Sequence, residues 1–430
     1  MRLNTKSLAS VALVAGASAL LVSCALVDPV TQLEAKNGKQ WYKGNTHTHT
    51  LWSDGDGAPE LAVAWYKDNC YDFLSLTDHN TLSRGIKDVP IQPGDKLTPE
   101  RVEMLKKQFG ANTINIHEKD GKQYMRLKTL DELERRFNEP GKFLLIEGEE
   151  ITGKTHVNGI NLRKVIEPSP SQDNVESMRF QVDAVNKHAK ETGQPMLAHL
   201  DHPNWSRGVS AEEIASVPQV RFFEIFNGAG AGIRHWGNKE EGKPTMAKKW
   251  DVVLTQRLSK NKEDILYGVG TDDTHKYFTA GSNPGRGWIM VLAEKLTVNS
   301  LVEAILRGDF YSSGGVTLDA IHYNSKEFTV IPKADKGVTY TTQFIGTRKG
   351  YDSSSTVRKG PDGKEMKHRT RIYSDEVGEV LYETTDIPAV YPFSGDEIYV
   401  RAKITSSSLK KNPMEKGDYE MAWTQPVVPE

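Results

Sequence analysis

The chain has 430 residues, and 55 Lys and Arg against 57 Asp and Glu give it a formal net charge of −2. This near neutrality gives no electrostatic reason to expect a specific nucleic-acid partner or binding to an anionic membrane surface. The length predicts two or three domains, and a hydrophobic content of 37% is typical of a globular protein rich in loops.

Residues 1–24 have the layout of a bacterial lipoprotein signal peptide. Two basic residues precede an apolar run at 8–22, which is too short for a convincing membrane span. The run ends in Leu-Val-Ser-Cys24, which resembles a lipobox, so Cys24 is predicted to carry the lipid; an ordinary signal peptide is the alternative. Ala25 favours the outer membrane, so we expect an exported protein anchored only by its lipid and facing the periplasm, or else the cell surface. Residues 25–40 are predicted to be a linker.

Short apolar runs alternate with amphipathic stretches from residue 41 onward, and residues that can bind metal stand beside most of the runs. Buried strands alternating with helices are typical of parallel βα units, whose polar ends gather on one face of a barrel. The pattern therefore predicts an α/β barrel with a single site. The runs with their flanking polar residues cover 41–49, 72–79, 143–150, 156–162, 195–202, 221–227 and 265–275, and helices are predicted at about 59–67 and 171–192.

Residues 84–141 depart from this alternation, with many Lys and Glu and two helical patches near 99–109 and 130–137. We expect an insertion over the mouth of a barrel that spans 41–314. It is either a lid that recognises substrate or a solvated structural insertion.

Short alternating strands with turn residues follow a last predicted helix at about 298–307. The segments 338–345 and 398–404 are examples. They predict a small antiparallel β domain over 315–430.

Six of the twelve His lie beside the apolar runs, together with Asp54, Glu150 and Asp273. A lone His there would more often be structural, but this many are hard to explain without metal. In a strand, His47 and His49 point to the same face and can reach one ion, while Asp54 beyond a bend serves a neighbouring ion. Imidazole and carboxylate ligands suit Zn, Mn or Fe, and the lack of a Cys ligand argues against a structural zinc site.

These motifs, in this order, resemble those of the PHP family, named for polymerase and histidinol phosphatase, in its exported lipoprotein form. The motifs are HxHxxxxD at His47, His49 and Asp54, then Asp78-His79, Glu150, His156, His202-Pro203 and Asp273-x-His275. The resemblance covers about 44–314 and implies a distorted (βα)7 TIM-like barrel with two or three divalent ions.

The resemblance also implies a ligand set for each ion. His47 and His49 would bind the first with Asp273 and a bridging Glu150. Glu150, His156 and His202 would hold the second. Asp54, His79 and His275 would hold the third. Asp78 and Asp272 are expected to orient imidazoles rather than to bind metal.

Two of these assignments have competitors in the sequence. Glu147 and Glu149 lie beside Glu150, which is preferred because an Ile and a Thr follow it, matching the Ile and small hydroxyl residue of the family. His199 competes with His202, which the adjoining proline favours.

Phosphate-binding residues are less well defined. Many family phosphatases carry a basic residue soon after the His-Pro motif, but this chain has Asn and Trp there. Arg207, Arg234 and Arg286 are candidate phosphate clamps. The Gly-rich loop after the run at 221–227 could bring Arg234 and His235 to the site, or it could be a plain turn.

The combined prediction is a metal-dependent phosphoesterase of the EC 3.1 class, either a phosphatase or a nucleotide- or exonuclease-like enzyme. A metal-bound water would be the nucleophile, and a small phosphoester or nucleotide would be the substrate. One alternative is an amidohydrolase or envelope-substrate hydrolase on the same metal site. Another is a non-catalytic metal-containing binding lipoprotein. The sequence does not identify the metal or the oligomeric state.

Overall fold

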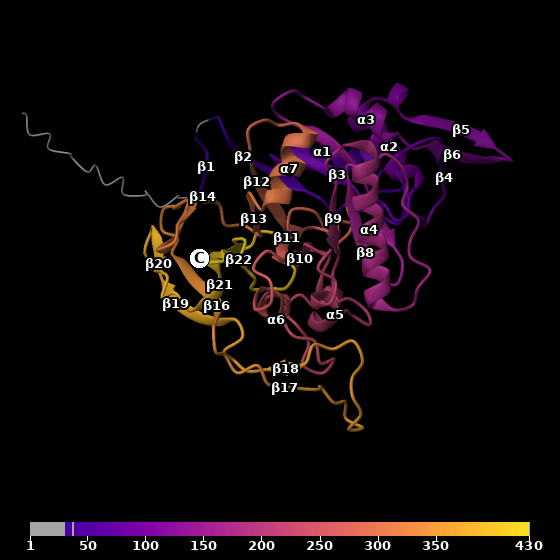
Figure 1. Ribbon diagram of the computed structural model, residues 1–430. Helices are drawn as coiled ribbons and strands as arrows, with labels where there is room; N and C mark the ends of the chain where they lie inside the picture. The colour runs from indigo at the N-terminus through magenta and orange to yellow at the C-terminus, as the bar shows by residue number, and fades with distance from the viewer. Residues whose placement is uncertain (1–30, 37, 430) are drawn as a thin grey trace, which may run out of the picture.

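The computed structural model describes residues 31–36 and 38–429 (Figure 1). The predicted signal peptide, the lipidation site Cys24 and the linker up to residue 30 lie outside this part of the chain. None of the helices described there is long and apolar enough to cross a membrane.

Helix boundaries follow the capping residues. Thr129 and Ser210 each form a capping box with a Glu three residues on, and Gly193 ends the longest helix in the left-handed conformation. The predicted helices are confirmed within three residues. The α-helices in the described residues are α1 (Pro59–Asp68), α2 (Pro99–Phe109), α3 (Leu130–Phe137), α4 (Asn174–Thr192), α5 (Ala211–Ala215), α6 (Met246–Leu258) and α7 (Val298–Arg307).

One sheet of thirteen strands runs through the described residues in the order β11-β10-β9-β8-β7-β3-β2-β12-β13-β22-β21-β16-β19. The first nine strands of this order, called below the first half of the sheet, are in chain order β2 (Gln40–Asn45), β3 (Phe73–Leu76), β7 (Leu144–Thr152), β8 (His156–Ile160), β9 (Leu197–Leu200), β10 (Phe222–Asn227), β11 (Tyr267–Thr271), β12 (Trp288–Ala293) and β13 (Phe310–Ser313).

The prediction of parallel strands holds for two groups and is wrong for β8. β2, β3 and β7 run parallel, as do β9, β10 and β11. β8 is antiparallel to both neighbours because only three residues separate it from β7, whereas a parallel crossover needs a dozen or more. β12 is antiparallel to β2.

The fold is therefore mixed α/β. No ladder between the named strands of the described residues closes a barrel, but an isolated parallel bridge joins Thr48, after β2, to Thr274, after β11. β11 stands at one end of the order with no ladder to β12. The two edges still approach closely, since a Cβ at Gly270 of β11 would lie 2.9 Å from the Trp288 carbonyl oxygen of β12.

The C-terminal region is antiparallel, as predicted, but it continues the same sheet through the pairing of β22 with β13. Its strands there are β16 (Tyr340–Arg348), β19 (Glu379–Thr384), β21 (Glu397–Leu409) and β22 (Tyr419–Trp423). A second sheet, β1-β14-β15-β20, shares an apolar core with them. Its strands are β1 (Thr31–Glu34), β14 (Leu318–Tyr323), β15 (Glu327–Pro332) and β20 (Ala389–Pro392). The division into two domains at residue 314 stays a prediction.

Residues 31–34 were expected to belong to the linker but form β1, which pairs with β14. Leu33 is its buried residue, and one apolar side chain between polar neighbours gives too little periodicity to reveal a strand.

The insertion at 84–141 contains α2, α3, the 3₁₀ turn η1 (Ala111–Thr113) and a small sheet of β4 (Asp88–Pro90), β6 (Lys122–Arg126) and β5 (Asn115–Lys119). Its apolar side chains pack with those of α1. Lys96 Nζ donates to the Asp54 carbonyl oxygen at 2.6 Å, so the insertion supports the loop that carries Asp54.

Candidate metal centre

Nine side chains converge where the strands of the first half of the sheet end. They are His47, His49, Asp54, His79, Glu150, His156, His202, Asp273 and His275, named below the nine-residue cluster. Five strands, β2, β3, β7, β9 and β11, supply eight of them, either from the strand itself or from the loop that follows. The ninth, His156, is the first residue of β8. The carboxyl ends of parallel strands meet at one edge of a sheet, which explains why residues spread over more than 200 positions meet.

The first donor group joins His47, His49 and Asp273. The Nε2 atoms of the two imidazoles lie 3.1 Å apart, and Asp273 Oδ1 lies 3.3 Å from the first and 3.2 Å from the second. Glu224 Oε1 is 2.7 Å from His47 Nδ1, so that nitrogen carries the proton. The other nitrogen of His47, Nε2, faces the cluster.

Glu150 lies between the first group and the second. Its Oε2 is 3.5 Å from His47 Nε2 and 3.3 Å from His49 Nε2. Its Oε1 is 2.6 Å from His156 Nδ1 and 3.1 Å from His202 Nε2. This is the position that a bridging carboxylate needs.

The competing residues lie elsewhere. Glu147 pairs with Arg84, and Glu149 accepts a hydrogen bond from the Ile166 amide at 2.5 Å. His199 contacts Asp201, with Nδ1 2.8 Å from Oδ1. The structure thus places Glu150 and His202, and not their competitors, in the cluster.

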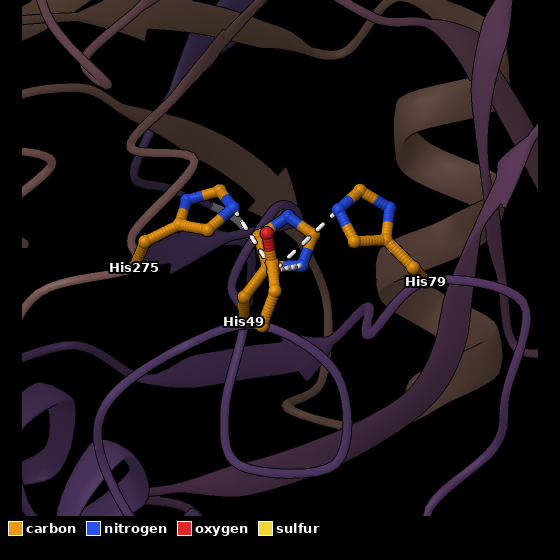
Figure 2. A group of neighbouring side chains, drawn as sticks. His49, His79 and His275 are labelled. Carbon is orange, nitrogen blue, oxygen red and sulfur yellow. Dashed lines mark ion pairs between the residues drawn. The ribbon is translucent and has the colours of Figure 1, made fainter. Parts of the chain in front are cut away.

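The third group surrounds Asp54. Its Oδ1 is 3.2 Å from His275 Nε2, 3.5 Å from His79 Nε2 and 3.6 Å from His49 Nδ1. Figure 2 shows the three imidazoles of this group gathered around one point. Burial alone would lower the pKa of His79, but the carboxylates of Asp54 and Glu150 raise it to about 10.

The donor set fits divalent cations. Glu150 Oε2 and Asp273 Oδ1 are buried and accept no hydrogen bond within the described part of the chain. Both oxygens have imidazole nitrogens as neighbours, at 2.8 to 3.5 Å, and a cation among these donors would balance the buried carboxylate charge. His202 and Asp273 also have φ of 26° and 49°, a conformation in which non-glycine residues are strained and which concentrates at functional sites.

Glu224 and Asp201 are buried partners that the motif comparison missed. Glu224 holds the His47 Nδ1 proton, and its Oε2 accepts from the His202 backbone amide at 2.7 Å, so it positions two members of the cluster. Asp201 Oδ1 lies 3.9 Å from His47 Nδ1, and burial raises the pKa of this carboxyl. The sequence feature that could have revealed Glu224 is its position inside the apolar run Phe-Phe-Glu-Ile-Phe. A charged residue there is rarely buried without a partner.

Asp78 and Asp272 hold loops and touch no imidazole of the cluster in the residues described. Asp78 accepts from Ser53 Oγ at 2.6 Å, and Ser53 Oγ lies 3.4 Å from His49 Nδ1. Asp272 accepts from Tyr66 and from the backbone amides of 285–287. The expected orienting role belongs directly to Glu224.

A cavity of about 610 Å³, named the first cavity, opens onto the cluster. The other walls are Trp205, the loop at 229–233 that includes the 3₁₀ turn η2 (Ala231–Ile233), Lys276 and Ser282. No residue of 84–141 lines it, so the insertion does not form a lid over this cavity in the structure described.

None of the four predicted substrate clamps lines the first cavity. Arg234 pairs with Glu241, with Nη2 2.7 Å from Oε1, and Arg286 donates to the Gly228 carbonyl oxygen at 2.8 Å. His235 is buried among aromatic rings, and burial lowers its pKa to about 3. Arg207 is exposed outside this cavity. The cation on its wall is Lys276, which the sequence gave no reason to select.

The loop at 203–209, directly after His202, is held by cations that bind its carbonyl oxygens. Lys249 Nζ is buried and donates to the carbonyls of Pro203, at 3.0 Å, and Val209. Lys243 Nζ donates to the Ser206 carbonyl at 2.8 Å. Burial lowers the pKa of Lys249 to about 7.

The Lys249 pKa predicts a pH dependence of stability. The unfolded chain keeps this lysine protonated up to pH ~10, whereas the folded protein loses the proton above pH ~7. Stability therefore rises with pH across that window, by up to ~1.4 kcal/mol per pH unit. We expect the Lys249→Met variant to lack this rise when unfolding free energies in urea are compared at several pH values. The exposed Lys260→Met variant should keep it, and an unchanged pH slope in Lys249→Met would contradict the assignment.

Comparisons with known proteins add little. The chain matches no family model and no curated protein. Among solved structures, it is similar to a two-domain protein from Bacteroides vulgatus ATCC 8482 that is described as containing a predicted PHP-like metal-dependent phosphoesterase. The identity is 14% and the TM-score 0.39, over 91% of this chain and 96% of that chain. The functional proposal therefore rests on the geometry of the cluster.

Proposed function

We propose that this protein is a metal-dependent hydrolase of the PHP type, whose nine-residue cluster binds two or three divalent ions of Zn, Mn or Fe and cleaves phosphoesters. One observation supports this above all: neighbouring donor groups share Glu150, His47, His49 and His79, so the nine side chains form one connected cluster, and this cluster faces one open cavity. A closed structural site would leave no such room for substrate beside its ligands.

The cluster offers each ion a mixed set of nitrogen and oxygen donors. His47, His49 and Asp273 would hold one ion, His156 and His202 another, and Asp54, His79 and His275 a third, with Glu150 between the first two. When bound, the ions supply Lewis-acid polarisation of a phosphoryl group and activation of water.

The chain's own residues orient and enclose the reaction. Glu224 keeps His47 Nε2 directed into the cluster, and the Lys276 ammonium on the cavity wall can bind a phosphate oxygen. The two hydroxyls on the wall are occupied, because Thr152 Oγ1 lies 2.6 Å from His79 Nδ1 and Ser282 Oγ donates to the Ala229 carbonyl at 2.7 Å. Water is therefore the proposed nucleophile rather than a side chain.

The sequence alone supports the remaining parts of the proposal. These are a small phosphoester or nucleotide as substrate, and export as an outer-membrane lipoprotein through Cys24.

The direct test is hydrolysis of bis-p-nitrophenyl phosphate and p-nitrophenyl phosphate by the mature protein loaded with Mn or Zn. His49→Ala should lower turnover by at least ~1000-fold, because it removes a nitrogen donor from two groups at once. His117→Ala is the matched control, since this partly exposed imidazole lies in the insertion. The protein could bind two or three ions and hydrolyse neither compound, yet cleave members of an amide panel. In that case amide hydrolysis replaces phosphoester hydrolysis as the proposed function.

A further inference from the structure

A second cavity, of about 410 Å³, lies beside the first and shares His156, His202 and Trp205 with it. The rest of its wall comes from the β7–β8 turn, the segment before α4 and the loop at 203–209. A substrate bound over the nine-residue cluster can therefore extend into this second cavity.

The wall of the second cavity carries two cations that have no acidic partner. Lys154 is half-buried and Arg207 exposed, and neither Nζ nor the guanidinium makes a hydrogen bond or ion pair within the described residues. The acidic residue on this wall, Asp201, is fully buried and directed at His199. Neutral polar side chains, among them Gln172 and Ser206, complete the lining. Unpaired cations beside neutral donors favour an anionic ligand.

Trp205 separates the two cavities. Its indole packs against the rings of His156 and His202, with centroids 5.2 Å and 5.3 Å away, while 46% of the residue stays exposed. A large indole held on one side and open on the other offers a surface for an apolar or aromatic part of a ligand.

A segment of the C-terminal region holds the backbone that carries Arg207. Residues 349–378, which include β17 (Ser355–Thr356) and β18 (Ile372–Tyr373), form an arm that reaches α5 and α6 (Figure 1). Arg369 of this arm donates to the carbonyls of Arg207 and of Glu241, the latter at 2.6 Å. The backbone of the loop that carries Arg207 is thus held in place, which lowers the entropy cost of ordering it when a ligand binds.

We propose that the second cavity is a subsite for a second anionic group of the substrate, bound by Lys154 and Arg207, with an apolar or aromatic portion lying on Trp205. The inference rests on the proposed phosphoester hydrolysis and narrows its substrate class. The preferred substrate is a phosphoester that carries, besides the group to be cleaved, a further phosphate or carboxylate.

A binding experiment tests the subsite without catalysis. Phenyl phosphate, which combines an anion with a ring, is titrated by calorimetry into the protein freed of metal by a chelator. Comparing the wild-type protein with a variant of the second cavity assigns the binding, because that variant leaves the residues of the first cavity in place. Lys154→Gln/Arg207→Gln should weaken binding about tenfold or more, and Lys260→Gln, at an exposed lysine that lines neither cavity, should leave it unchanged. No binding by the wild-type protein at about 10 mM probe, or equal binding by the double variant, overturns the proposal.

A kinetic experiment tests the substrate class. The p-nitrophenyl ester of thymidine 5′-phosphate is compared with the same ester carrying a 3′-phosphate, using metal-loaded protein. The double variant should raise KM about tenfold for the 3′-phosphorylated ester alone and leave kcat unchanged for both. An equal effect on the two esters overturns the inference. If neither these esters nor p-nitrophenyl phosphate and its bis ester are hydrolysed, the proposed function fails, and the calorimetric result still decides the subsite.

Discussion

Replacing Glu150 with Gln is expected to lower kcat/KM at least ~1000-fold, which corresponds to ~4 kcal/mol of transition-state stabilisation. The carboxylate lies within 3.5 Å of five imidazole nitrogens, those of His47, His49, His79, His156 and His202. A glutamine keeps the size of the side chain but removes the negative charge and one of the two donor oxygens. Elemental analysis should show fewer bound ions per chain.

Glu149→Gln is a closely matched control for this prediction. Successive residues of a strand face opposite sides, and Glu149 accepts the Ile166 amide on the side away from the cluster. Burial raises the pKa of Glu149 to about 7, so glutamine resembles a form that this residue already adopts near neutral pH. Activity and metal content should stay within about twofold of the wild-type protein. The bridging role of Glu150 is wrong if both variants lose activity equally or if Glu150→Gln retains its ions.

The second large effect is on stability. Arg401→Met should lower the free energy of unfolding by about 3–5 kcal/mol, because it leaves the Asp251 carboxylate buried without its cation. Arg401 of β21 bonds both oxygens of Asp251 in α6, at 2.7 Å and 2.6 Å, and Tyr399 adds a hydrogen bond at 2.9 Å. The pair joins the C-terminal strands to a helix of residues 41–314. Urea unfolding at neutral pH measures the loss.

Two further variants separate charge burial from general damage. Asp251→Leu/Arg401→Met removes both charges and should recover most of the lost stability. Lys364→Met breaks the exposed pair with Asp362 in the C-terminal region and should cost less than about 1 kcal/mol. A double variant as unstable as Arg401→Met would show that the uncompensated charge is not the cause.

Local features of this molecule were predictable from its sequence because short-range chemistry decides them. A Pro or a side-chain oxygen at the start of a helix and a Gly at its end act within a few residues, so α1 to α4 and α7 were predicted nearly to the residue. The convergence of the nine-residue cluster was also predictable. Metal-type residues at the ends of successive strands meet wherever those strands lie in one sheet.

The tertiary structure decided what depends on contacts between distant residues. It reversed the direction of β8 and joined the C-terminal strands to the main sheet. It also placed β1 in an apolar core, although the sequence of β1 carries little strand periodicity. The fold further placed Glu150 in the cluster and Glu149 outside it, as the sequence motif had indicated. Alternation along a strand says only that the two face opposite sides, not which side meets the cluster.

The surroundings of the candidate site were the least predictable part. Arg234, His235 and Arg286 are directed into protein contacts, whereas Glu224 and Lys276 lie where the sequence motifs did not point. The direction of a side chain beside a loop is set by the packing of elements far away in the chain. The sequence by itself thus determined which donors could gather, and the fold determined which charges surround them.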